Sequence, residues 1–177
     1  MIKVIDLEAT CWDDGSRDKV SEIIEIGGVT VDLSNGEIID RFQSFIRPQL
    51  NPTLSNFCKE LTSITQKDVD SARYFNEVYP SFIRWFGSPK KHILASWGNY
   101  DKKQLRKDVE LHGLEWKMGE EHWNLKHMFE QRFATGSQMG LNTAVKLLGM
   151  EFIGTHHRGI SDAEHGGNVL IRVFHGN

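Results

Sequence analysis

The chain has 177 residues with a formal net charge of −3, and 39% of its residues are hydrophobic. This length suits one domain over residues 1–177, and the 10 phenylalanines and 5 tryptophans exclude a disordered chain. The acidic balance excludes a protein that holds nucleic acid through a broadly basic surface, so any such contact must be local or helped by cations.

The cysteines and the lengths of the apolar runs indicate the cellular compartment of the protein. Cys11 and Cys58 lie far apart without CxxC spacing, which argues against a zinc site or a disulfide framework and fits a reducing compartment. No apolar run reaches the roughly 18 residues of a membrane span, and the first ten residues meet charge too early for a signal peptide. We therefore expect a cytoplasmic protein with no membrane partner.

The apolar pattern predicts an α/β fold. Three consecutive strands are predicted at residues 2–10, 22–32 and 38–48, with a tight turn between the last two that suits an antiparallel pair. The rest predicts helices at 51–62, 65–72, 76–87, 99–113, 140–149 and 160–175, a strand at 92–97, and a short strand running into a helix at 122–133. Strands followed by interleaved helices and strands indicate a mixed central sheet, its first three strands antiparallel, sandwiched by helices.

The first strand carries two unexpected charges. Asp6 and Glu8, in "VIDLEATCW", are one residue apart, so their side chains point to the same face of the strand and repel each other. Taken alone, the pair is equally compatible with acids that face solvent.

Two later acids and a histidine complete a possible site. Asp101 and Asp162 stand at predicted helix starts, and His157 precedes Asp162 by five residues. If the fold gathers the four carboxylates, protons or cations must neutralise them. Oxygen ligands favour Mg²⁺ or Mn²⁺, and two such ions roughly 3.5–4 Å apart stabilise both the attacking and the leaving oxygen of a phosphoryl displacement. A neutral histidine could then take the proton of the attacking water.

Simpler explanations exist for single residues of this set. Asp101 alone would be an ordinary helix-start acid favoured by the helix dipole. The basic run at 102–107 could hold phosphates, but such runs are usually solvated helix faces. His156 and His165 compete with His157 for the role of base, and spacing selects His157. A zinc site at His165 lacks supporting cysteines or an HExxH pattern.

The D-x-E at Asp6 and Glu8, the later Asp101, and the H-x4-D at His157 and Asp162 together resemble the DEDDh group of 3′–5′ exonucleases. The segments "DLEATCW", "FCKELTSITQKDVD", "SWGNYDKKQL" and "HHRGISDA" are similar to the Eri-type exoribonucleases within that group. The resemblance covers the whole chain, and it implies a single exonuclease domain with a ribonuclease H-like, three-layer α/β/α fold.

The resemblance also implies an activity and a set of site residues. Asp6, Glu8, Asp101 and Asp162 would hold two divalent cations, Mg²⁺ or Mn²⁺, and His157 would be the general base. The expected substrate is a single-stranded 3′ end, RNA preferred, and the expected product a nucleoside 5′-monophosphate. The residues expected to bind the terminal nucleotide are Ala9, Thr10, Phe57, Leu61 and Trp97, of which the aromatic ones are equally compatible with the core.

Two other functions stay open at this stage. One is an exonuclease for short oligonucleotides or DNA ends, and the other is a non-catalytic nucleic-acid-binding or scaffold protein on the same fold. The complete catalytic set argues against the second. Because the chain shows no SAP-like nucleic-acid-binding extension, a partner protein could deliver the substrate. No oligomeric state follows from the sequence.

The segment after Asp162 departs from the family pattern. The family continues with a basic stretch resembling "DARNI", whereas this chain reads "DAEHGGNV". Each glycine inside a helix costs about 1 kcal/mol relative to alanine. The pair Gly166–Gly167 therefore predicts a helix that is either locally loosened or packed unusually close to its neighbour.

Overall fold

The computed structural model describes residues 1–15, 18–154 and 157–176. These residues contain a mixed six-stranded sheet in the order β4-β3-β2-β1-β5-β6. The strands β1, β2 and β3 are antiparallel, and β5 and β6 add to β1 in parallel. The strands are β1 (Ile2–Ala9), β2 (Ile23–Asp32), β3 (Glu37–Arg47), β4 (Arg73–Tyr74), β5 (Ile93–Ser96) and β6 (His122–Asn124).

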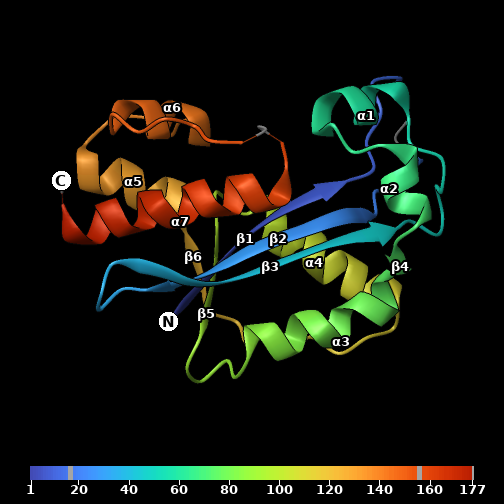
Figure 1. Cartoon of the computed structure of the whole chain (residues 1–177), viewed down its shortest axis with the longest axis horizontal. Coiled ribbons are helices and arrows are strands. Elements are labelled where there is room, and N and C mark those ends of the chain that lie inside the picture. The colour runs from blue at the N-terminus through green and yellow to red at the C-terminus, as the bar shows by residue number, and fades with distance from the viewer. Residues whose placement is uncertain (16–17, 155–156, 177) are drawn as a thin grey trace.

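Helices cover both faces of this sheet (Figure 1). The helices are α1 (Asn56–Thr62), α2 (Gln66–Asp70), α3 (Phe75–Phe86), α4 (Tyr100–Leu111), α5 (Leu125–Phe133), α6 (Leu141–Leu147) and α7 (Gly159–His175). The helices α3 and α4 pack with one face, whereas α7 and α5 pack with the other, and α6 lies against α5 and α7. The predicted three-layer α/β/α fold is confirmed.

Alternation along β1 decides which side chains reach which layer. Ile5 and Leu7 belong to the core beneath α3 and α4, whereas Ile2 and Val4 belong to the core beneath α7. Successive strand residues point to opposite faces, so Asp6 continues the α7 face of the sheet. The predicted common face of Asp6 and Glu8 is therefore the face that α7 covers.

Two local features differ from the prediction. The helix expected at 51–62 begins only at Asn56, because the Ser55 hydroxyl caps it by accepting the N–H of Cys58 at 2.9 Å. The short edge strand β4 was not predicted, since its two residues are too few for a periodic pattern and it forms by pairing with Ile46 and Arg47 of β3.

Three glycines let α7 lie directly on the sheet. A Cβ at Gly27 would come within 2.0 Å of the Gly159 carbonyl carbon, so the start of α7 touches the backbone of β2. A Cβ at Gly167 would meet Val29 at 2.9 Å, and one at Gly166 would meet Val4 at 3.2 Å. Because α7 is continuous through this pair, the close-packing alternative for Gly166–Gly167 is the one confirmed.

Among the residues that the structure describes, no helix combines the length and the apolar character needed to cross a membrane.

Candidate active site

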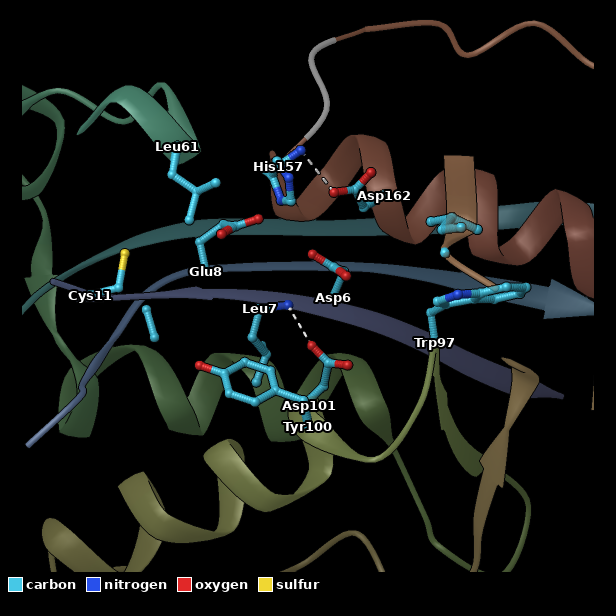
Figure 2. A pocket seen from close by; sticks show the side chains of 13 residues that line it. Asp6, Leu7, Glu8, Cys11, Leu61, Trp97, Tyr100, Asp101, His157 and Asp162 are labelled. Carbon is cyan, nitrogen blue, oxygen red and sulfur yellow. Dashed lines mark hydrogen bonds between the residues drawn. The ribbon is translucent and has the colours of Figure 1, made fainter. Parts of the chain in front are cut away.

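A cavity of about 410 Å³ lies at the junction of β1, the start of α4 and the start of α7. All five residues of the predicted catalytic set line it, and in Figure 2 the carboxylates of the set point toward one another across it. These residues are Asp6, Glu8, Asp101, His157 and Asp162. The fold therefore brings together groups that are separated by more than 150 positions in the chain.

The strand β1 supplies two of the carboxylates. Asp6 is opposite Gly27 in the β1–β2 register, and Glu8 is opposite Glu25. Because Gly27 has no side chain, α7 approaches the sheet beside Asp6. The backbone of β1 thus places both carboxylates under the first turn of α7.

The third carboxylate lies at the start of α4, the helix that follows β5. Asp101 lies in the first turn of α4, is only 4% exposed, and accepts the backbone N–H of Leu7 at 3.0 Å. This hydrogen bond ties the start of α4 to β1 at the residue between Asp6 and Glu8. The position of Asp101 is therefore fixed relative to the β1 pair.

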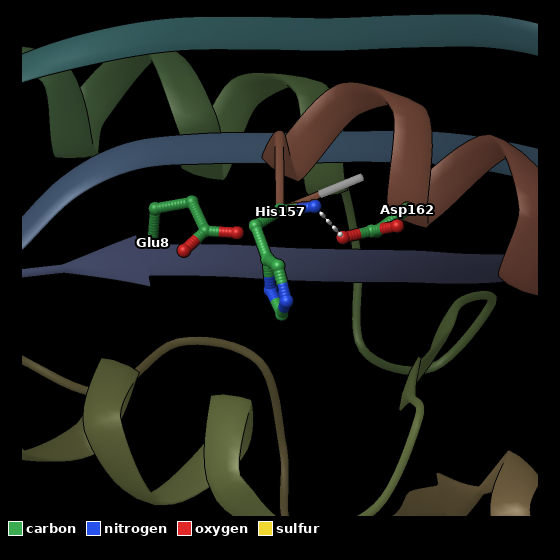
Figure 3. Close-up of side chains that lie close together, drawn as sticks. All are labelled: Glu8, His157 and Asp162. Carbon is green, nitrogen blue, oxygen red and sulfur yellow. Dashed lines mark hydrogen bonds between the residues drawn. The ribbon is translucent and has the colours of Figure 1, made fainter. Parts of the chain in front are cut away.

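His157 and Asp162 sit at the start of α7 (Figure 3). The backbone N–H of His157 donates to Oδ2 of Asp162 at 3.0 Å. His157 has a φ of +60°, a left-handed conformation that histidine adopts more readily than bulky residues. Ligand atoms of Glu8, His157 and Asp162 lie within 4.8 Å of one another.

Burial and mutual repulsion disfavour ionised carboxylates in this cavity. Burial, followed by the charges of Asp101 and Asp162, raises the pKa of Asp6 well above its usual range. Burial, followed by the charge of Asp162, raises the pKa of Glu8 to about 8. Burial raises the pKa of Asp101 to about 6, although the N–H of Leu7 opposes this effect. The site has an excess of negative charge that bound cations would neutralise.

This repulsion predicts how stability depends on pH without metal. The pKa of Glu8 is about 8 in the fold against its ordinary value of 4.5, so the folded state holds more protons between these values. The contribution of Glu8 to stability should be fully present below about pH 4.5 and be lost, by a few kcal/mol, as the pH rises through about 8. Thermal unfolding in EDTA measures this fall. Added Mn²⁺ should raise the melting temperature more at pH 8 than at pH 5, and a pH-independent increase would contradict the prediction.

The residues expected to bind a nucleotide divide into two groups. Ala9, Leu61 and Trp97 line the cavity. Thr10 and Phe57 are not among its described lining residues. Thr10 is 2% exposed, and its hydroxyl accepts the N–H of Glu22, whereas Phe57 is 36% exposed on α1.

Sequence reasoning missed further residues of the cavity wall. Tyr100 and Cys11 line it, as do Gly140 and Leu141 at the start of α6. Tyr100 directly precedes Asp101 in the chain, so the motif that identified Asp101 could also have identified Tyr100. Gly140 and Leu141 have no such signal, because only the packing of α6 against α7 brings them to the site.

Glu25 is a buried carboxylate behind the site that the sequence analysis did not single out. It is 0% exposed and accepts the Gly159 N–H at 3.1 Å and the Arg158 Nε at 3.1 Å. Gln43 donates to its other oxygen at 2.7 Å. These bonds join β2 to the first turn of α7, immediately after His157. Its signal was a charge inside an apolar strand, the same signal that marked Asp6.

Comparison with known proteins places the chain in a family. The family described as Exonuclease matches residues 4–170, which is most of the chain. The chain belongs to this exonuclease family. Human 3'-5' exoribonuclease 1 is 33% identical over 181 residues, covering 98% of this chain and 52% of the relative. The 3'-5' exonuclease eri1 of Schizosaccharomyces pombe is 28% identical, covering 96% of this chain and 66% of the relative.

A solved structure supports the same assignment. The nuclease domain of 3'hExo, described as a DEDDh family member bound to rAMP, superposes with a TM-score of 0.88 at 32% identity. The match covers 97% of this chain and 90% of that domain. The resemblance to the DEDDh and Eri-type exonucleases, with their ribonuclease H-like fold, is thus confirmed. The chain spans only about half the length of the human relative.

Membership of the DEDDh exonucleases implies divalent metal ions, and the residues present fit them. The cavity collects carboxylate oxygens, the donor type that hard divalent cations prefer. Burial and neighbouring carboxylates raise the pKa values of Asp6 and Glu8, so a bound cation would stabilise their ionised forms. The candidate ligands are Asp6, Glu8, Asp101 and Asp162.

Proposed function

We propose that residues 1–177 form a single metal-dependent 3′–5′ exonuclease domain. Its substrate would be a single-stranded 3′ end, RNA preferred, and its product a nucleoside 5′-monophosphate. The observation that carries this proposal is the convergence of four carboxylates and His157 in one cavity of an exonuclease-family chain. The names of the relatives, 3'-5' exoribonuclease 1 and 3'-5' exonuclease eri1, support the direction of attack.

The four carboxylates and the histidine have separate roles in this mechanism. Asp6, Glu8, Asp101 and Asp162 would hold two divalent cations, Mg²⁺ or Mn²⁺. Cations bound there supply charge stabilisation for the attacking and leaving oxygens of the phosphoryl displacement. His157 accepts the proton of the attacking water, which it can do only while its imidazole is neutral. The hydrogen bond from its backbone N–H to Asp162 keeps the base beside the carboxylates.

The apolar wall of the cavity fits the terminal nucleotide. We propose that the main chain at Ala9 contacts the terminal nucleotide, and that the side chains of Leu61 and Trp97 pack against it. Tyr100 joins this wall and presents a half-exposed ring, a surface on which a base can stack for about 1–3 kcal/mol. Thr10 and Phe57 lie outside the lining and would act by supporting β1 and α1.

The decisive experiment uses a 5′-labelled single-stranded RNA with a free 3′ hydroxyl. The protein is incubated with it in Mn²⁺, in Mg²⁺ and in EDTA, beside a matching DNA and a dinucleotide. A ladder that shortens from the 3′ end and stops in EDTA is the expected result. Faster cleavage of the dinucleotide or of DNA would favour the alternative substrates. No cleavage of any substrate, with metal binding demonstrated, would favour the non-catalytic alternative.

Glu25→Gln tests whether the buried carboxylate positions the catalytic histidine. The variant keeps the shape of Glu25 but removes the charge that holds Arg158. We expect kcat to fall by about 10–100-fold with KM little changed, because the first turn of α7 loosens beside His157. Stability should fall by about 1–3 kcal/mol.

Steady-state kinetics below the melting temperature separates the expected loss of kcat from the expected loss of stability. The exposed Glu110→Gln on α4 removes the same charge away from α7 and should leave both kcat and stability unchanged. A Glu25→Gln enzyme that is less stable but retains full kcat would show that Glu25 has only a structural role.

A further inference from the structure

A second cavity of about 420 Å³ lies on the other side of the start of α4. Its lining is largely basic and comes from α4 together with the segment that leads into β6. We call it the basic pocket, and its described lining residues are Asn99, Lys102, Lys103, Arg106, Glu120 and His122.

The basic pocket keeps a net positive charge. Arg106 forms an ion pair with Glu120 at 2.8 Å, and the Lys102 ammonium donates to the backbone carbonyl of Glu120 at 2.7 Å. The one carboxylate therefore balances one of the three cations. Burial lowers the pKa of His122 to about 4, so this residue is neutral at physiological pH.

The placement of these cations is unfavourable for α4 itself. Lys102 and Arg106 are separated by one helical turn, so they lie on the same side of the helix and repel each other. Lys103, also on this lining, is exposed. Clustering these cations on α4 costs energy although the chain as a whole is acidic, with a net charge of −3. A negatively charged ligand bound beside them would offset this repulsion.

The basic pocket and the active-site cavity flank the first turn of α4. Tyr100 and Asp101 line the active-site cavity, and their neighbours Asn99 and Lys102 line the basic pocket. A strand whose terminal nucleotide occupies the first cavity can therefore pass the start of α4 into the second. The positive end of the α4 dipole points toward the same place.

We propose that the basic pocket binds backbone phosphates of the RNA strand upstream of its terminal nucleotide. This inference rests on the proposed function, since it assigns the path of the same substrate. The cations of the basic pocket attract the negatively charged phosphates of the strand next to the active site. Affinity for a long strand should then depend on the basic pocket, whereas affinity for a substrate that ends within the first cavity should not.

The test compares two double variants with the same loss of charge. Lys102→Gln/Lys103→Gln removes two cations from the basic pocket, and Lys90→Gln/Lys91→Gln removes two exposed cations before β5, at the opposite end of that strand. Binding of a labelled 12-nucleotide RNA is measured by fluorescence anisotropy in Ca²⁺ over a salt series, with intact RNA confirmed on a gel. Cleavage of the 12-mer and of a dinucleotide is measured in Mn²⁺.

The Lys102/Lys103 double variant should bind the 12-mer about tenfold more weakly than the wild type. Its slope of log affinity against log salt should be smaller by about 1.4, the value for two lost phosphate contacts on a single strand. Its kcat/KM should fall for the 12-mer and stay within twofold for the dinucleotide.

An equal loss in the Lys90/Lys91 double variant, an unchanged 12-mer affinity, or an equal loss on the dinucleotide would overturn the proposal. Absence of cleavage by the wild type would refute the proposed function separately, because the anisotropy series does not require turnover.

Discussion

Asp6→Asn is expected to abolish nuclease activity while leaving the fold intact. Asp6 projects from β1 into the cavity and shares it with Asp101 and Asp162, so it is a central candidate ligand. Loss of a carboxylate ligand removes several kcal/mol of charge stabilisation from the transition state, which lowers kcat by about 10³-fold or more. Titration calorimetry with Mn²⁺ should show weakened or lost binding.

The same substitution should stabilise the metal-free protein. Burial and four neighbouring carboxylates raise the pKa of Asp6, so the ionised side chain destabilises the fold at neutral pH. Asparagine has the same shape without the charge, and the melting temperature in EDTA should rise. The exposed Asp13→Asn is the matched control and should change neither property. Unchanged turnover in Asp6→Asn would refute the assignment of Asp6 as a ligand.

His157→Ala is expected to lower kcat by about 10²–10⁴-fold, the usual cost of a lost general base. Mn²⁺ affinity should change much less, because the carboxylates remain. This second measurement is informative since His157 lies in the same 4.8 Å group as Glu8 and Asp162. If Mn²⁺ affinity fell in proportion to kcat, His157 would be a ligand and not a base.

Two further variants separate the loss of the base from a change in folding and from the alternative base. His157 has a φ of +60°, and asparagine tolerates that backbone well, so His157→Asn should lose activity without a change in folding. His156, the alternative base from the sequence, lies outside the described residues, and His156→Ala should retain activity. If His156→Ala lost turnover and His157→Ala did not, the spacing argument that selected His157 would be wrong.

The amino-acid sequence alone predicted the family, the three-layer fold and a site rich in carboxylates. Strong local patterns are the reason: the apolar runs around Asp6 and Glu8 predict a strand, and charges inside such a run require an explanation. The five-residue spacing from His157 to Asp162 was equally informative, because it places a histidine and a carboxylate on either side of a helix start. These signals depend only on residues close together in the chain.

Tertiary structure decided which residues complete the site. Gly140 and Leu141 reach the cavity only because α6 packs against α7, and Glu25 bonds to Arg158 and Gly159 only because Gly27 lets α7 touch β2. Contacts between distant segments leave no periodic trace in a single sequence. The sequence therefore predicted the four carboxylates and His157 that line the cavity, whereas the other lining residues and Glu25 depend on how the helices pack on the sheet.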